Sequence, residues 1–442
     1  MNTTTPIDAT RLINASPIGA FQWRVVALCA LVALLDGFDV QVMALVTPTI
    51  REEWGLPVSA FGTILSASFA GILLGATIGG LLGDRLGRRR ILIAAFLFVG
   101  LTSWLTALST SATHLIACRL LTGFGIGACM PNFTALTVEY VPAHRQALSV
   151  TLVFSSIPLG GIIAAFVAGD IIDQYGWRML FVLGGVLPIM IALLLIAALP
   201  ESIRFLVHRG GNTRKVGEIL GRIDPRYRHD PAREVCMEES RTKATPAALF
   251  REGRSGVTVV LWSVFFFSLF GLYLMTSWLP TVFRLHGWPL EAALNSISLF
   301  FTGGIIGGLA VGWLIDRYGA LRVLAVTYLS GAVFTAGIGL AQESMVATMV
   351  LITCSGLTIV GGQTGTTALA AKTYPTSIRS TGVGWGLGVG RVGAVISPWL
   401  GGLAVGAAWS HSTLFASAAA PPLLCAALIL FLRGGRSTRP PA

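Results

Sequence analysis

Four ionisable residues fall inside long apolar stretches. Asp36 and Asp39 are three residues apart and so share one face of a helix, while Arg119 and Arg391 interrupt two other stretches. A charge inside a membrane costs roughly 2.5–3.5 kcal/mol on insertion scales, and such residues usually serve function. Two neighbouring carboxylates in a low dielectric do not both ionise readily. The acids therefore predict proton coupling; the alternative is a pair of packing acids neutralised by arginine.

Each arginine needs a negative partner, because a guanidinium stays protonated in proteins. We expect Arg391 to hold the carboxylate of a substrate in a bidentate contact, and Arg119 to tune the two acids. Asp39 is expected to contact both proton and substrate. Pairing of either arginine with Asp36 or Asp39 remains open.

Uncharged side chains in the apolar stretches form a second group of candidates. Gln363 and Asn132 could read a ring hydroxyl, or could only hydrogen-bond neighbouring helices. Phe38, Trp385 and Tyr273 could stack on an aromatic ring, although most aromatic residues in such stretches pack against helices or lipid.

The composition indicates that lipid surrounds most of the chain. Of its 442 residues, 54% are hydrophobic and 12% are charged, against about 25% charged in soluble proteins. Apolar stretches of about 20 residues, enough to span a bilayer, are expected at 24–48, 58–82, 91–110, 113–136, 146–168, 177–199, 256–279, 293–315, 321–340, 344–369, 380–403 and 412–432. The predicted fold is an all-α membrane protein of twelve transmembrane helices.

The distribution of charge predicts an orientation. The formal net charge is +11, and most Lys and Arg fall in alternate loops, which the positive-inside rule places in the cytoplasm. We expect a cytoplasmic tail at 1–23, a helical half at 24–199, a cytoplasmic loop at 200–255, a second half at 256–432 and a cytoplasmic tail at 433–442. The polar start predicts no cleaved signal peptide. The loop shows no folded basic module for nucleic acid, and no metal or cofactor site is expected.

The chain repeats itself. Gly80-Leu-Leu-Gly-Asp-Arg-Leu-Gly-Arg-Arg-Arg90 has a weaker copy at Gly312-Trp-Leu-Ile-Asp-Arg-Tyr-Gly319, with the Asp residues 232 apart (316 − 84). Pro142 and Pro375, which follow related segments, are 233 apart (375 − 142). The constant offset predicts two pseudo-symmetric six-helix bundles with a substrate site between them. A monomer suffices for this architecture.

The repeated loops could latch one state of a rocking protein. Contacts of this kind form in one state and break in the other. The candidates are Asp84, Arg85, Gly87, Arg88, Glu139, Arg145, Asp316 and Arg317. For the arginines the alternative is a topology signal alone, and for Glu139 a surface ion pair of little energy.

These motifs, with Arg119-Leu-Leu-Thr-Gly-Phe-Gly-Ile-Gly127, resemble the major facilitator superfamily over essentially the whole chain. Within it, Asp36-Gly-Phe-Asp-Val-Gln41 is similar to the aromatic acid:proton symporter family. So are Pro131-Asn132, Gly361-Gly-Gln363 and Gly388-Val-Gly-Arg-Val-Gly393. The resemblance implies proton-coupled import of benzoate- or 4-hydroxybenzoate-type acids for aromatic catabolism, through the bacterial inner membrane. It also suggests a proton-relay or gating role for Arg119.

Other functions remain open as alternatives. Another organic anion, such as the dicarboxylate muconate, fits two buried arginines, whereas a sugar or an organic cation fits them less well. Pro200-Glu-Ser-Ile-Arg204 resembles an element of sugar porters, but it is widespread. A drug antiporter is disfavoured because Ile157-Pro-Leu-Gly-Gly161 departs from the expected element. No enzyme motif is found, so an enzyme is not expected.

Overall fold

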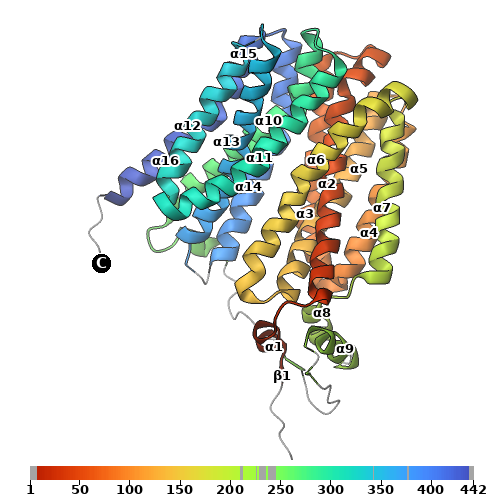
Figure 1. The fold of residues 1–442 in the computed structure, drawn as a ribbon, viewed down its shortest axis with the longest axis vertical. Coiled ribbons are helices and arrows are strands. Elements are labelled where there is room, and N and C mark those ends of the chain that lie inside the picture. Colours follow the sequence, from red (N-terminus) through yellow and green to blue (C-terminus); the bar gives the residue numbers. More distant parts are fainter. Residues whose placement is uncertain are drawn as a thin grey trace, which may run out of the picture.

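The computed structural model describes residues 7–209, 213–224, 226–227, 235–236, 245–341, 343–375 and 378–437, with the side chains of Ile7, Thr213 and 433–437 outside the description. Parts of the predicted tails at 1–23 and 433–442 and of the 200–255 loop therefore lie outside the described residues. Within the described residues, twelve helices are long and apolar enough to cross a membrane. The helices form two halves side by side (Figure 1), and the predicted fold class is confirmed.

The helices of the N-terminal half are α2 (Ala20–Trp54), α3 (Val58–Leu86), α4 (Arg88–Ala107), α5 (Ala112–Tyr140), α6 (Ala143–Tyr175) and α7 (Arg178–Ala198). Those of the C-terminal half are α10 (Ser255–Leu285), α11 (Leu290–Tyr318), α12 (Ala320–Ile338), α13 (Met345–Thr373), α14 (Arg379–Gly406), α15 (His411–Ala418) and α16 (Ala420–Ser437). The last expected span is thus divided between α15 and α16. Pro421 and Pro422 lie just after the break, where proline is tolerated in a first helical turn.

Glycines end helices where the chain must turn sharply. Gly87 separates α3 from α4 with φ +102°, and Gly319 separates α11 from α12 with φ +86°. Both angles lie in a region that residues with a Cβ rarely adopt. We call the end of the bundle that carries these two loops the basic end, and the opposite end the far end.

The same close packing of two helices occurs within each half. A Cβ on Gly75 of α3 would lie 2.0 Å from the carbonyl oxygen of Phe124 on α5. A Cβ on Gly307 of α11 would lie 1.9 Å from the carbonyl oxygen of Leu357 on α13. Small residues let transmembrane helices approach this closely. The two glycines are 232 apart (307 − 75), so the packing shares the offset of the loop motifs.

Short elements lie at the basic end beneath the N-terminal half (Figure 1). They include α1 (Ala9–Ala15), α8 (Ile203–Arg209) and α9 (Thr213–Ile223), and η1 (Pro246–Phe250) precedes α10. Strand β1 (Ile7–Asp8) pairs in parallel with β2 (Val235–Cys236), with Ile7 opposite Val235. The start of the chain is thus joined to the segment that links the halves.

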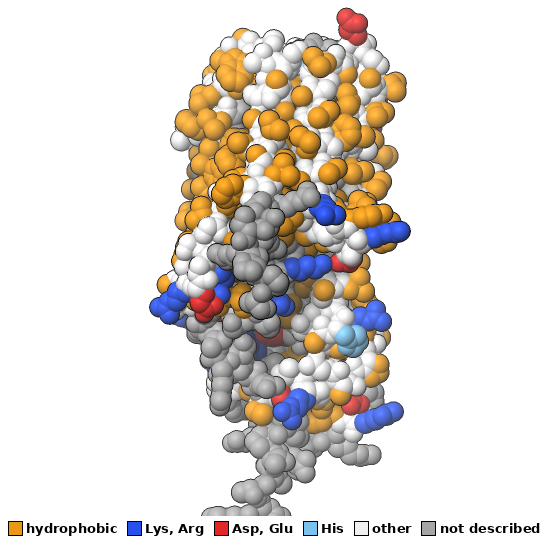
Figure 2. Space-filling view, turned by 90° about the vertical axis from the view of Figure 1, so that its left-hand side faces the viewer, with side chains coloured by type: hydrophobic (Ala, Val, Ile, Leu, Met, Phe, Trp, Pro, Cys, Tyr) orange, Lys and Arg blue, Asp and Glu red, His pale blue; other side chains and the backbone are white. Residues whose placement is uncertain are grey.

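The surface separates apolar and basic regions. In Figure 2, hydrophobic side chains cover the upper part of the view, while Lys and Arg lie in its middle and lower parts. This division fits a protein whose middle faces lipid and whose basic end faces water.

Candidate functional site

A cavity of about 450 Å³ lies between the two halves. It is lined mainly by α5 and α14, and it reaches from Arg391 to Arg88, Glu139 and Arg204. Along α5 this distance is covered by residues from Met130 to Glu139, about 14 Å at 1.5 Å per residue. The cavity therefore extends from the middle of the bundle towards its basic end.

The far end is closed by contacts between the halves. Gln41 of α2 donates a hydrogen bond to the carbonyl oxygen of Thr276 on α10 (3.1 Å), and Glu52 pairs with Arg284 (3.1 Å). Deeper in the bundle, the ring of Phe69 on α3 lies 4.4 Å from that of Tyr273 on α10, measured between centroids. These contacts separate the cavity from the far end.

Arg391 is a cation with a weak partner. Its Nη2 donates to the Sδ of Met130 across the halves at 3.2 Å, and a thioether is a poor acceptor. No ion pair between described residues includes Arg391. Its guanidinium interacts electrostatically with Asp36. The cavity thus presents a guanidinium that can accept an anionic ligand.

The two acids of α2 have different partners. Asp39 is 5% exposed, and its Oδ2 lies 3.2 Å from the Nη1 of Arg119. Asp36 is 4% exposed and interacts electrostatically with Asp39 and Arg391. Among the described residues, no cation lies within ion-pair distance of its carboxylate. One acid is therefore matched by a fixed charge and the other is not.

Arg119 is held entirely within the N-terminal half. Its Nη2 donates to the hydroxyl oxygens of Thr106 (2.8 Å) and Thr122 (3.0 Å), and its guanidinium lies 4.8 Å from the ring centroid of Phe181. The structure thus brings together Asp39 and Arg119, which sequence reasoning could pair only as one of several options. Sequence reasoning missed Thr106 and Thr122, whose only signal is a hydroxyl in an apolar stretch.

The other predicted substrate contacts lie in varied surroundings. The side-chain oxygen of Gln363 is buried, with no hydrogen-bond partner among the described residues. Asn132 donates to the carbonyl oxygens of Gly79 (3.0 Å) and Ala128 (2.7 Å), which ties α5 to α3. Phe38 is buried at 4% exposure in the core of the N-terminal half.

Trp385 lies on a different face of α14 from its neighbours. Gly384 and Leu387 line the cavity, whereas the ring of Trp385 is 47% exposed and stacks on Trp262 at 5.9 Å between centroids. Phe154 of α6, by contrast, lines the cavity. Phe154 is an aromatic side chain that sequence reasoning missed.

Three of the latch candidates in the N-terminal half, Asp84, Arg88 and Glu139, form a connected network. Arg88 pairs with Glu139 and, at 3.2 Å, with Asp84. The hydroxyl of Ser202 donates to the Oε2 of Glu139 at 2.7 Å. The network therefore joins α3, α4 and α5 to the segment that follows α7.

Glu201 completes this network, although it was not among the predicted site residues. Its Oε1 accepts from the backbone N–H groups of Arg89 (3.0 Å) and Ser202 (2.9 Å). A Cβ on Gly87 would lie 2.6 Å from its Oε2, so this turn needs glycine for space as well as for φ. The signal in the sequence was the 200–204 element.

The remaining latch candidates are more exposed. Asp316 pairs with Lys372 at 3.0 Å, with both side chains more than half exposed. The guanidinium of Arg317 lies 5.6 Å from the ring centroid of Trp313. Arg85 and Arg145 are exposed, and no ion pair between described residues includes them.

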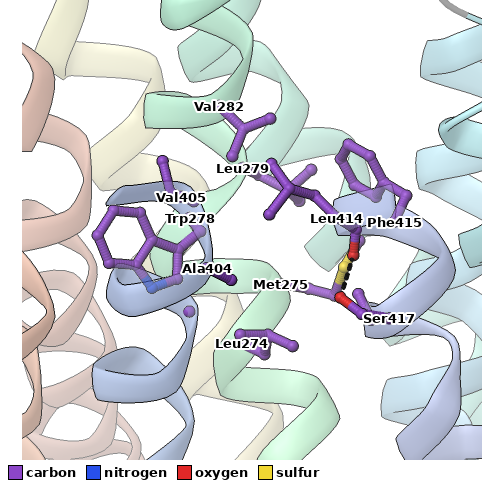
Figure 3. Close-up of a pocket in the computed structure, with 12 residues that line it drawn as sticks. Leu274, Met275, Trp278, Leu279, Val282, Ala404, Val405, Leu414, Phe415 and Ser417 are labelled. Atoms are coloured by element: carbon purple, nitrogen blue, oxygen red, sulfur yellow. Dashed lines mark hydrogen bonds between the residues drawn. The ribbon is translucent and has the colours of Figure 1, made fainter. Parts of the chain in front are cut away.

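A second pocket is apolar (Figure 3). It lies between α10, α14 and α15, has a volume of about 50 Å³ and carries no charged side chain among its lining residues. The indole N–H of Trp278 already donates to the carbonyl oxygen of Pro398 (3.0 Å). Since benzene fits an apolar cavity of roughly 150 Å³, this pocket is too small for an aromatic acid.

Comparison with known proteins identifies the family. The Major Facilitator Superfamily profile matches residues 29–364 and 295–442. The chain belongs to the major facilitator superfamily. A partially occluded, inward-open structure of the Escherichia coli xylose transporter superimposes with a TM-score of 0.72 at 17% identity, and covers 96% of this chain and 100% of that one. This likeness shows the shared fold.

Three similar members of the superfamily are named as transporters of aromatic acids. A 4-hydroxybenzoate transporter of Pseudomonas aeruginosa is 38% identical over 96% of this chain and 95% of its own. A gallate transporter of Pseudomonas putida is 35% identical over 96% and 95%. A benzoate transport protein of Acinetobacter baylyi is 32% identical over 98% and 94%. The resemblance to the aromatic acid branch, and the prediction of a transporter rather than an enzyme, are thereby confirmed.

Proposed function

We propose that this multi-pass membrane protein is a symporter that imports an aromatic carboxylate of the hydroxybenzoate type together with a proton. The proposal depends above all on Arg391, whose guanidinium faces the cavity between the halves and, among the described residues, has only the thioether of Met130 as a hydrogen-bond partner, at 3.2 Å. A carboxylate would replace that weak contact by a charge-assisted, bidentate one.

The charges of the cavity support an anionic substrate. Three arginines and one glutamate line it, which leaves two formal positive charges. Phe154, Met130 and Leu387 line the same cavity and offer apolar surface for a ring. The substrates for which the similar transporters are named, 4-hydroxybenzoate, gallate and benzoate, favour the same substrate class.

The two acids of α2 would have different roles. Asp36 would carry the transported proton, because it lies near Arg391 without an ion-pair partner of its own. Asp39 and Arg119 would form the fixed pair that holds α2 against α5. With a substrate carboxylate on Arg391 and a proton on Asp36, the site then holds equal numbers of positive and negative charges. Gln363, with its unpaired oxygen, is kept as a candidate contact to a ring hydroxyl.

The cavity would alternate between the two sides of the bacterial inner membrane. With both termini and the basic end in the cytoplasm, as the positive-inside rule suggests, this structure would be the inward-facing state. The Arg88–Glu139–Asp84 network, with Arg85, Gly87 and Arg145, would rearrange as the far end opens. Asp316 and Arg317 would form the weaker counterpart in the other half.

Binding of 4-hydroxybenzoate to purified protein tests the site. We expect Arg391→Gln to weaken binding about 30-fold or more, as for loss of a partner from a desolvated charge pair, and Arg391→Lys to weaken it less. Arg209→Gln is the matched control, because Arg209 lies outside the cavity lining. Equal affinity of wild type and Arg391→Gln would contradict the assigned role. Wild-type binding of another anion but no aromatic acid would contradict the substrate class.

A further inference from the structure

The mouth of the cavity carries a second arginine. Arg204 is an exposed residue of α8, and it lines the same cavity as Arg391. Its helix is held in place, since Ile203 is fully buried and Leu206 nearly so. The hydroxyl of Ser202 also donates to Glu139 (2.7 Å) and accepts from the backbone N–H of Phe205 (3.0 Å). The position of Arg204 at the mouth is thus set by the fold.

The charge of Arg204 is not used within the described part of the chain. Arg88, beside it at the mouth, is occupied by Glu139 and Asp84. No ion pair between described residues includes Arg204, and its electrostatic interaction with Arg88 is repulsive. Arg209 of the same helix offers a contrast, because its guanidinium lies over the ring of Phe205 (5.7 Å) and away from the cavity lining.

Arg391 and Arg204 line different levels of the same cavity. Arg391 lies at the level of Met130, which it contacts, and the mouth lies at the level of Glu139. Met130 and Glu139 are nine positions apart on α5, a helical rise of about 14 Å. The level of Arg204 is therefore distinct from that of Arg391.

We propose that Arg204 forms a second carboxylate-binding position at the mouth of the cavity, which the aromatic acid occupies between solvent and Arg391. This inference rests on the proposed function. A cleft lined by one sign of charge concentrates oppositely charged ligands and speeds their association, and salt weakens the effect. Arg204 would thus set how fast the anion enters and leaves the inward-facing cavity, while Arg391 sets how tightly it is held.

Stopped-flow binding of 4-hydroxybenzoate to the purified full-length protein in a neutral detergent tests this role. At low ionic strength we expect Arg204→Gln to lower the association rate roughly 3- to 10-fold, at the low end of electrostatic steering effects, and Arg204→Lys to keep most of the rate. The difference from wild type should disappear at high ionic strength. Arg209→Gln should behave as wild type throughout.

Several results would overturn the inference. A wild-type association rate in Arg204→Gln at low ionic strength would overturn this inference and leave the proposed function in place. An effect that appears only after phosphatidylglycerol is added would make Arg204 a lipid contact instead. A lowered thermal stability of Arg204→Gln, with a slower rate at every ionic strength, would indicate a structural role. Absence of wild-type binding would contradict the proposed function, and this inference with it.

Discussion

The Nη1 of Arg119 on α5 lies 3.2 Å from the Oδ2 of Asp39 on α2, and both side chains are almost completely buried. Two threonines and an aromatic ring surround the same guanidinium. A buried pair of this kind contributes little relative to an apolar pair, but removal of one partner strands a charge in a low dielectric.

Arg119→Gln is therefore expected to destabilise the protein by about 3–5 kcal/mol. The double variant Asp39→Asn/Arg119→Gln should recover part of that loss, because no charge remains unpaired. Thermal unfolding of the purified variants in detergent measures both effects. Strictly additive losses would mean that the two residues do not stabilise the fold as a pair.

The unpaired acid should behave differently from the paired one. Asp36→Asn removes a titratable group beside Arg391 without removing an ion-pair partner. We expect it to keep substrate exchange across liposomes and to lose accumulation driven by a proton gradient. Counterflow and gradient-driven uptake, measured in parallel, separate these two activities. Gradient-driven accumulation at the wild-type level in Asp36→Asn would assign the proton elsewhere.

The Arg88–Glu139 pair should matter more than its counterpart in the other half. Glu139 and Arg88 are about nine-tenths buried, whereas Asp316 and Lys372 are more than half exposed. Glu139→Gln should cost about 2–3 kcal/mol and slow transport, because it leaves a largely buried cation with fewer partners. Asp316→Asn should stay within about 0.5 kcal/mol of wild type. Thermal unfolding and uptake rates compare the two variants, and equal losses would contradict the difference in burial.

Two aromatic residues near the cavity give a matched pair for the ring of the substrate. Phe154 lines the cavity, whereas Trp385 stacks on Trp262. Since an aromatic contact contributes about 0.5–1.5 kcal/mol beyond area burial, Phe154→Leu should weaken affinity roughly 2- to 10-fold. Trp385→Leu should leave affinity unchanged. Equilibrium binding decides between them, and the reverse result would restore Trp385 as the ring contact.

Close packing of α11 on α13 gives a test of the fold. Gly307→Ala places a Cβ 1.9 Å from a backbone oxygen, while Gly312→Ala on the same helix meets nothing within 4 Å. Overpacking of this kind costs about 1–3 kcal/mol or more. We expect a lower unfolding temperature and a less monodisperse preparation for Gly307→Ala only. Size-exclusion chromatography and thermal unfolding check this, and a Gly307→Ala variant as stable as wild type would contradict the packing.

Regular physical signals predicted most of the fold. The lengths of the apolar stretches predicted the helices, and the offset of 232 residues (316 − 84) between Asp84 and Asp316 predicted two related halves. The partner of Arg119 was not predictable, because it depends on how α2, α4 and α5 pack around it. The faces of α14 were not predictable either. That helix is rich in glycine and has no clear apolar stripe, so Trp385 and its neighbour Gly384 could not be assigned to opposite surroundings. Arg204 was visible only as part of a widespread element, since the cavity beside it is formed by distant helices.

The most direct test of the central claim is uptake of labelled 4-hydroxybenzoate by purified protein in liposomes, with and without an inward proton gradient. The account predicts accumulation that needs the gradient, and loss of that accumulation in Arg391→Gln. Equal uptake with and without the proton gradient would contradict proton coupling. Flux of another anion, with no aromatic acid transported, would contradict the proposed substrate while leaving the fold and the family in place.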